Sequence, residues 1–518
     1  MRRATRQPRP ARSTFWAMPR SVCALVLAVA CTRASSSIPF VDGPLDLTIR
    51  YPTSSPVAVR DSVASWGSVG SGRATLAING RRVRVEPNGA FAVWLPVPPG
   101  PAPVLNFTAT LKGRTITGQA PIVRIAEGDS APDLPRPAAG WARVRRLPSD
   151  TADSATQRRP VASRWFPGGP PALPLPLGTR LPFDARTRDA VRLRLAEGVR
   201  VWVSAAEVDS VAPARPDPVL LGAMTLAEQD QQVEVRVAVA EPLPSAVEVV
   251  GTRVRWSVFG ARHASDVVSP APLHGYVRAA QRASGPAGRA DLELRLAAPP
   301  AGWRTRWTDG RLMLELRTPR PAGRGLTDLV VALDAGHPPG GATGPTGLRE
   351  DSVTLAVAQA TARALGRLGA RPILVRQDAR PLSLEARTAT AEAANAQVYL
   401  SIHVNAPGDR YPPQEADGTQ TFYAQPLAEP LAQALLDSVS RATGQRSRGI
   451  ESADFAVLRT TWFPAALIEG ACIVLPEREA WLRTQAGVDA YSAGIVAGLR
   501  RWVSDTQTQQ DTVSKEKP

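Results

Sequence analysis

Two histidines occupy positions from which they could bind a metal ion together. His337 follows the short apolar run 330–333, and His403 directly follows the apolar run 398–402. Runs of this length predict buried parallel strands. In sheets of parallel strands, ligands collect just beyond the carboxyl ends of the strands. We therefore expect both imidazoles at one edge of a sheet. The alternative is that each is an ordinary core or surface histidine.

A carboxylate lies between the two histidines in the sequence. Glu350 opens a segment whose apolar residues recur with helical spacing as far as Leu368. In a first helical turn, the helix dipole favours a carboxylate, which can point toward the strand ends. Two imidazoles and one carboxylate are the ligands of many catalytic zinc sites. We predict that His337, Glu350 and His403 bind Zn²⁺. Because their spacing is too wide for a single helix, a sheet must bring them together.

A second glutamate has a different environment. Glu469 ends the apolar run 465–468. A carboxylate at the end of a buried strand costs free energy unless it is paired, protonated or used in chemistry. We predict that Glu469 is a catalytic carboxylate. The alternative is an ion pair at the strand end.

Four motifs in fixed order give a family resemblance over about residues 328–503. They are DAGHPPGG at 334–341, LRED at 348–351, SIHVNA at 401–406 and FPAALIEGACI at 463–473. This series resembles the Amidase_3 family of zinc-dependent N-acetylmuramoyl-L-alanine amidases. The pattern of that family runs DPGHGG, a Glu opening the first helix, SIHAN and PAVLVETGF. The resemblance implies an α/β zinc hydrolase that cuts the amide bond between N-acetylmuramic acid and L-alanine in peptidoglycan.

The resemblance also implies roles for individual residues. His337, Glu350 and His403 match the zinc ligands of the family, and Glu469 matches its catalytic glutamate. The sequence departs from the family pattern at two places. Pro338-Pro339 interrupts the Gly-Gly after the first histidine, and Ala471-Cys472 replaces Gly-Phe after the glutamate. Neither departure removes a liganding or catalytic group.

Three further residues lie beside the motifs. Asp334 is predicted to orient a metal ligand without binding the metal itself. The alternative for Asp334 is a plain turn at a strand end. Arg349 and Asn405 are candidate substrate contacts.

Two other functions stay open at this point. A zinc peptidase or deacetylase on a similar sheet would use the same ligands, because the ligands do not specify the bond that is cut. A non-catalytic peptidoglycan-binding protein could keep the fold without the chemistry. Such a protein would usually lack a ligand or the catalytic carboxylate, and all four groups are present here.

The C-terminal part alternates between strand and helix patterns from residue 326 to 503. This alternation predicts a mainly parallel sheet covered by helices on both faces. Within it we expect a strand at 455–459 and one closing helix at 477–503. The polar tail 504–518 is predicted to be disordered.

The part before residue 326 is expected to be all-β. Alternating strands around Asn79-Gly80, a strong hairpin signal, predict a small β-sandwich at 45–125. Residues 126–172 are rich in Pro, Ser, Asp and Arg and predict a linker. Residues 173–210 resemble an SH3-like module. Residues 219–318 predict a β domain that resembles the AMIN domain, mainly because of its place before the catalytic part.

The first 31 residues are expected to export the chain. An Arg-rich start precedes the apolar run 22–30, which is too short for a permanent membrane span, and Cys31 follows. Two interpretations stay open: simple cleavage of a signal peptide, or a lipoprotein anchored to the membrane through Cys31. Both place the protein in the periplasm or cell envelope. Cys472 would then have no disulfide partner.

Length and charge bear on the number of domains and on the kind of binding partner. The 518 residues suggest three or four domains. The net charge is +16, and nearly all of the positive charge comes from arginine. A basic surface favours polyanionic surroundings such as cell-wall polymers. No array of basic and aromatic residues of the kind that binds DNA or RNA is present in the sequence. We expect peptidoglycan as the partner and no nucleic acid.

Overall fold

The computed structural model describes most of the chain. The described residues are 37–53, 61–122, 134–146, 160–169, 171–213, 218–229, 231–264, 269–270, 275–321, 323–408 and 411–515. The predicted export segment, with Cys31, lies outside them. Within the described residues, no helix is long and apolar enough to cross a membrane.

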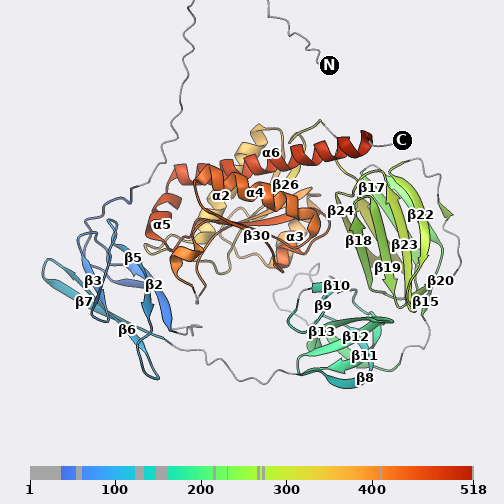
Figure 1. Ribbon diagram of the computed structural model, residues 1–518, viewed down its shortest axis with the longest axis horizontal. Helices are drawn as coiled ribbons and strands as arrows, with labels where there is room; N and C mark the ends of the chain where they lie inside the picture. Colours follow the sequence, from blue (N-terminus) through green and yellow to red (C-terminus); the bar gives the residue numbers. More distant parts are fainter. Residues whose placement is uncertain are drawn as a thin grey trace, which may run out of the picture. The chain divides into compact units, whose positions relative to one another are not determined.

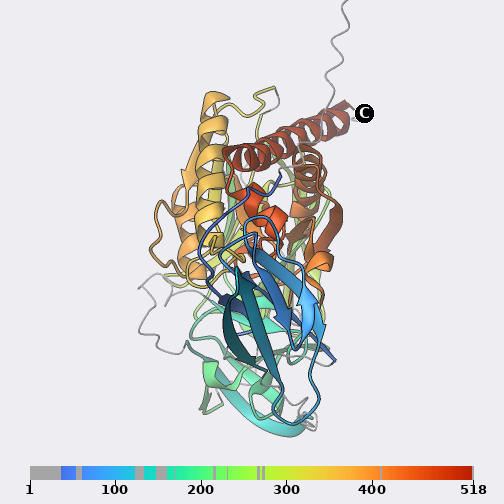
Figure 2. The same cartoon turned by 90° about the vertical axis from the view of Figure 1, so that its left-hand side faces the viewer.

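The first described domain consists of two antiparallel sheets around one hydrophobic core (Figure 2). One sheet has the order β1 (Thr48–Tyr51), β2 (Ser62–Ser68), β5 (Ala90–Pro96), and the other β4 (Arg81–Val83), β3 (Thr75–Ile78), β6 (Val104–Leu111), β7 (Arg114–Pro121). Phe91 of the first sheet and Phe107 of the second have ring centroids 6.1 Å apart. The Asn79-Gly80 hairpin forms as expected, since both residues have positive φ angles, 49° and 75°.

The second domain is one seven-stranded antiparallel sheet. Its order is β10 (Pro171–Leu175), β9 (Val161–Arg164), β13 (Val199–Ser204), β12 (Ala190–Ala196), β11 (Arg180–Arg186), β8 (Arg136–Val144), β14 (Val208–Val211), with the 3-10 helix η1 (Ala205–Glu207) before β14. The predicted linker 126–172 is therefore wrong for its described residues, which supply β8, β9 and the start of β10. Only Ala142 and Val144 of β8 are buried. The segment thus lacks an apolar pattern, and its strand depends on pairing with β11 and β14.

The third domain is also all-β, and its described residues form 11 strands around one core. They are β15 (Val219–Leu221), β16 (Met224–Gln229), β17 (Gln232–Ala238), β18 (Ser245–Val250), β19 (Arg253–Phe259), β20 (Ala261–His263), β21 (Ser269–Pro270), β22 (Val277–Ser284), β23 (Arg289–Leu296), β24 (Gly302–Thr308) and β25 (Arg311–Arg317). The two larger sheets have the orders β21-β16-β17-β25-β24 and β18-β19-β23-β22. The likenesses to SH3-like and AMIN domains stay predictions.

The C-terminal domain contains a six-stranded sheet (Figure 1). Its order is β27 (Arg371–Leu374), β26 (Val330–Ala335), β28 (Val398–Val404), β31 (Ala465–Gly470), β29 (Thr419–Tyr423), β30 (Ser447–Ser452). Every neighbouring pair is parallel except β31 with β29. The domain is thus α/β with a mainly parallel sheet, as the alternation of patterns predicts.

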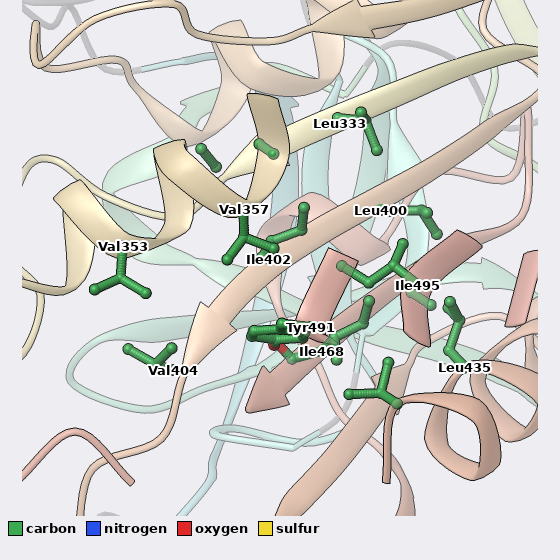
Figure 3. Close-up of a cluster of buried hydrophobic side chains, with 14 of the residues drawn as sticks. Leu333, Val353, Val357, Leu400, Ile402, Val404, Leu435, Ile468, Tyr491 and Ile495 are labelled. Carbon is green, nitrogen blue, oxygen red and sulfur yellow. The ribbon is translucent and has the colours of Figure 1, made fainter. Parts of the chain in front are cut away.

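Helices cover both faces of this sheet (Figures 1 and 2). The helices are α2 (Glu350–Arg367), α3 (Leu384–Ala393), α4 (Glu429–Thr443), α5 (Pro476–Leu482) and α6 (Gln485–Lys515), with 3-10 turns η2 (Pro413–Ala416), η3 (Pro426–Ala428) and η4 (Ala456–Leu458). α2, α4 and α6 share one core cluster with the sheet, and α3 and η4 share a second. Figure 3 shows side chains of the first cluster, with Leu333, Leu400, Ile402 and Ile468 from the sheet and Val357, Leu435 and Ile495 from the helices.

Three expected elements of this domain differ in the structure. Residues 455–459 contain the 3-10 turn η4 instead of a strand. The closing helix is broken into α5 and α6. The predicted disordered tail is helical as far as Lys515, because α6 continues through a segment without Gly or Pro. Apart from Val513, the sequence 504–515 is polar, so no apolar stripe predicts a helix there.

Candidate metal centre

Three elements bring the predicted ligands together at the carboxyl end of the sheet. His337 lies two residues after β26, Glu350 is the first residue of α2, and His403 is the penultimate residue of β28. One possible ligand atom from each lies within 4.8 Å of the others. Since β26 and β28 are parallel neighbours, both histidines lie at the same edge of the sheet. The geometry is that of a group able to hold a metal ion.

Glu350 lies between the two imidazoles. Its Oε2 is 3.4 Å from Nε2 of His337, and its Oε1 is 3.1 Å from Nδ1 of His403. The side chain is 5% exposed and also accepts hydrogen bonds from the backbone N–H groups of Ala342 (2.8 Å) and Val404 (3.3 Å). Burial would raise the pKa of Glu350, but hydrogen bonds and charge from both histidines hold it well below its usual range. The carboxylate is therefore ionised at neutral pH.

The imidazole of His337 has its two nitrogens in different environments. Nδ1 is 3.0 Å from the carbonyl oxygen of Pro339, an acceptor that favours a proton on Nδ1. Loss of the proton that Nε2 shares with Glu350 would then leave Nε2 with a free electron pair. That nitrogen is the one facing Glu350. The His337 and His403 rings meet edge to face, with centroids 5.0 Å apart. The backbone thus favours the tautomer of His337 that a metal ion requires.

Gly336 gives His403 the space it occupies. A Cβ added at Gly336 would lie 2.3 Å from Cε1 of the His403 ring. Because that separation is shorter than any real carbon contact, the ring or the backbone would have to move. The absence of a side chain at position 336 is therefore a requirement of the site.

We expect Gly336→Ala to destabilise the fold by about 1–3 kcal/mol, the usual cost of overpacking. Denaturant unfolding measures this loss. Gly366→Ala is the matched control, because a Cβ at that position in α2 meets nothing within 4 Å. Alanine in a helix should leave stability unchanged or raise it by up to about 1 kcal/mol. Equal unfolding midpoints for the two variants would contradict the steric account.

Glu469 lies next to His403 but outside the group of three. In the register of β28 and β31, Glu469 is the direct neighbour of His403. Its Oε2 is buried and has no hydrogen-bond partner among the described residues. Burial raises the pKa of Glu469 to about 7, against the opposing charges of His403 and His337. A carboxyl group with such a pKa can take up and release a proton near neutral pH.

The other predicted residues are placed as follows. Asp334 is buried and does not contact either histidine directly: it accepts hydrogen bonds from Tyr399 and Ser401 and pairs with Arg387. Arg349 is 62% exposed at its side chain and pairs with the carboxylate of Asp351. Asn405 exchanges backbone hydrogen bonds with Ala471 and Ile473.

Two residues support the site although no sequence pattern marks them. Glu479 of α5 is fully buried and accepts backbone N–H groups of Thr346 and Leu348, in the loop that leads to Glu350. The hydroxyl of Tyr491 donates to the carbonyl oxygen of His403, 2.7 Å away. Neither residue follows a strand end, and no local pattern marks a residue that acts on a distant backbone.

Comparison with known proteins places the match in the C-terminal domain. Residues 331–501 match the family model described as N-acetylmuramoyl-L-alanine amidase. The chain is 32% identical over 145 residues to the N-acetylmuramoyl-L-alanine amidase LytC of Bacillus subtilis, which covers 28% of this chain and 29% of LytC. It is 32% identical over 168 residues to the uncharacterized protein YqiI of the same species, covering 30% of this chain and 77% of YqiI.

A solved structure also matches part of the chain. The catalytic domain of CwlV, an N-acetylmuramoyl-L-alanine amidase from Bacillus (Paenibacillus) polymyxa var. colistinus, is 30% identical, with a TM-score of 0.32. The match covers 34% of this chain and 98% of that domain.

Proposed function

Because the chain belongs to the N-acetylmuramoyl-L-alanine amidase family, we propose that its C-terminal domain hydrolyses peptidoglycan. The bond cleaved is the amide between N-acetylmuramic acid and L-alanine. The observation that carries this proposal is the grouping of His337, Glu350 and His403, with Glu469 in register beside His403. Three possible ligands and a separate buried carboxyl group are what metal-assisted amide hydrolysis requires.

The group of three fits zinc. Two imidazoles and one carboxylate form a borderline donor set that zinc accepts with one position left open. The fit is supported by the ionised state of Glu350 and by the bond from Nδ1 of His337 to Pro339, which leaves Nε2 available. Bound there, zinc would supply Lewis-acid chemistry: it would polarise the amide carbonyl and make water a stronger acid.

Glu469 would handle the protons of the reaction. It takes a proton from the attacking water and returns that proton to the nitrogen of L-alanine as the amide bond breaks. The water oxygen ends on the lactyl carboxylate of muramic acid, and the peptide leaves with a free amino group. The pKa of about 7 and the unpaired, buried Oε2 both support this role for Glu469.

Two predicted substrate contacts remain part of the proposal. Arg349 is largely exposed next to Glu350, and its pairing with Asp351 fixes where its guanidinium lies. Asn405 follows His403 closely, and its backbone ties the end of β28 to the segment after Glu469. Both could meet the glycan or the stem peptide at the rim of the site.

The family match separates this proposal from its rivals. A zinc peptidase or deacetylase would use the same donor atoms, so the geometry alone does not choose the bond. A non-catalytic binding protein would have no need of a buried carboxyl group with a raised pKa. The relatives named as N-acetylmuramoyl-L-alanine amidases favour the muramyl amide. Since this chain spans 29% of the length of LytC, the activity of the whole protein is a proposal.

Location and partners follow from the substrate. Peptidoglycan lies outside the cytoplasm, so we propose that the protein acts in the periplasm or cell envelope. Export through residues 1–31, and a possible lipid anchor at Cys31, belong to this proposal. The β domains before residue 326 would then bring the C-terminal domain to the wall.

The product of the reaction tests the proposal. Purified peptidoglycan is incubated with the zinc-loaded full chain, and new amino termini are identified by mass spectrometry. We expect stem peptides with a free L-alanine amino terminus. A chelator should stop their release and added zinc should restore it. New termini at any other residue would indicate a peptidase, and the absence of any product would leave a binding protein.

A further inference from the structure

The backbone of His337 is held in an uncommon conformation. Its φ angle is +57°, in the left-handed region that residues other than glycine seldom adopt. Such a conformation persists only where the surroundings determine it. His337 belongs to the group that could hold a metal, so whatever fixes this backbone also fixes the position of its imidazole.

Arg387 of α3 binds the backbone on both sides of His337. Its side chain is 3% exposed. Its Nη1 donates to the carbonyl oxygen of Ala335 at 2.9 Å, and its Nη2 donates to that of Pro338 at 2.7 Å. One planar guanidinium thus spans the residues before and after the strained position.

Arg376, two residues after the end of β27, binds the same turn as Arg387 does. Its Nε donates to Ala335 at 2.7 Å, and its Nη2 donates to the carbonyl oxygens of Gly336 at 3.0 Å and Asp351 at 2.6 Å. Asp351 directly follows Glu350. Arg376 therefore connects the turn that carries His337 to the first turn of α2.

Asp334 anchors Arg387 to the strand that carries His403. Its Oδ1 accepts from Arg387 at 2.7 Å, and its Oδ2 accepts from Tyr399 at 2.7 Å and Ser401 at 3.0 Å. Tyr399 and Ser401 belong to β28. A continuous set of hydrogen bonds thus runs from β28 through Asp334 and Arg387 to the turn at His337.

Stability alone is a poor reason for this arrangement. Both guanidiniums are nearly fully buried, Arg376 at 5% exposure, and burial lowers the pKa of Arg376. Apolar side chains of similar volume are often as stabilising as buried charges. What the arginines provide, and apolar side chains cannot, is directed N–H groups for three carbonyls that lie within two residues of His337.

We propose that Arg376 and Arg387 are positioning residues of the metal centre. They fix the backbone at 335–338 and so hold the His337 imidazole where it meets Glu350 and His403. This inference rests on the proposed metal site and adds residues that none of the four sequence motifs contains. The hydrogen-bonded set also gives Asp334 its role, which is to hold Arg387 and not to contact a ligand directly.

The test is Arg387→Lys in the full chain. Lysine keeps the positive charge and can still pair with Asp334, but its single ammonium cannot span two carbonyls in a plane. We expect the zinc dissociation constant to rise about tenfold. This is the lower end of the loss in metal affinity seen when a residue that orients a metal ligand is substituted. It is measured by competition with a chelating dye, at a temperature where the metal-free variant is folded.

Arg459→Lys is the matched control. Arg459 is a partly buried arginine of the same domain that pairs with Asp454 and makes no hydrogen bond to 335–338. Its substitution should lower the melting temperature of the metal-free protein and leave zinc affinity unchanged. If Arg387→Lys does the same, its role is merely structural and the inference fails.

Two further outcomes are informative. If Arg387→Lys does not fold, Arg376→Lys tests the same turn from its other side with the same expected loss of zinc affinity. Unchanged zinc affinity in that folded variant would overturn the inference. Failure of the unsubstituted chain to bind zinc at all would instead overturn the proposed function on which it rests.

Discussion

Glu469→Gln should lose about 10²- to 10⁴-fold in kcat and keep its zinc, the loss expected when a proton-transferring group is removed. Glutamine has the shape of glutamate but cannot accept a proton at this position. Glu469 lies outside the group of three possible ligands, so the metal should remain. The rate is measured on a soluble muropeptide at saturating zinc, and the zinc content by elemental analysis of the same sample.

The environment of Glu469 also predicts that this variant folds. The carboxyl group has a raised pKa because burial penalises its charge, and a neutral amide avoids that penalty. Near neutral pH, the denaturant concentration at the unfolding midpoint of the metal-free variant should therefore equal or exceed that of the unsubstituted chain. A variant that keeps its full rate would show that another group moves the proton.

Glu350→Gln should cause the largest loss of metal. Glu350 is the one carboxylate in the group of three, and its charge is what offsets the charge of a divalent cation. Glutamine can still accept the hydrogen bond from Ala342, so the fold should be kept. We expect the zinc dissociation constant to rise by more than the roughly 10- to 100-fold that follows substitution of a residue that only orients a ligand. Competition against a chelating dye measures it, and activity at limiting zinc should fall in parallel.

Glu479→Gln is the control for this loss. Glu479 is likewise buried and accepts backbone N–H groups of the neighbouring loop, but it is not one of the possible ligands. Its substitution should lower thermal stability while zinc still raises the melting temperature. For Glu350→Gln, that zinc-dependent rise should largely disappear, because ligand stabilisation depends on the ratio of zinc concentration to its dissociation constant. Equal zinc responses in the two variants would argue against Glu350 as a ligand.

The grouping of the candidate site residues could be predicted because each of them is marked by a local pattern in the sequence. A histidine that follows an apolar run, and a glutamate that opens a helical pattern, indicate strand ends and a helix start without knowledge of the fold. The order of the parallel strands then sets which residues are neighbours. Because β28 lies between β26 and β31, His403 lies next to both His337 and Glu469. Local pattern and sheet geometry together predict that these four residues lie close to one another, and their chemical roles stay proposals.

The supporting residues could not be predicted in this way. Arg376 and Arg387 act on backbone carbonyls that are about 40 to 50 residues away in the sequence. The chain is rich in arginine, and no sequence pattern distinguishes an arginine that donates to a distant backbone carbonyl from one that does not. The same limit explains β8, whose few apolar residues gave no strand signal before its partners were known.

If this chain cleaves the muramyl–alanine amide by adding water to its carbonyl, the oxygen of that water must appear in one of the two products. The most direct test is digestion of purified peptidoglycan by the zinc-loaded full chain in water enriched in heavy oxygen, with mass spectrometry of both product halves. We expect heavy oxygen in the lactyl carboxylate of muramic acid and an unlabelled peptide with a free L-alanine amino terminus, both formed about 10²- to 10⁴-fold more slowly by Glu469→Gln. Heavy oxygen in a peptide carboxylate or in released acetate would contradict it, since these products belong to a peptidase and a deacetylase.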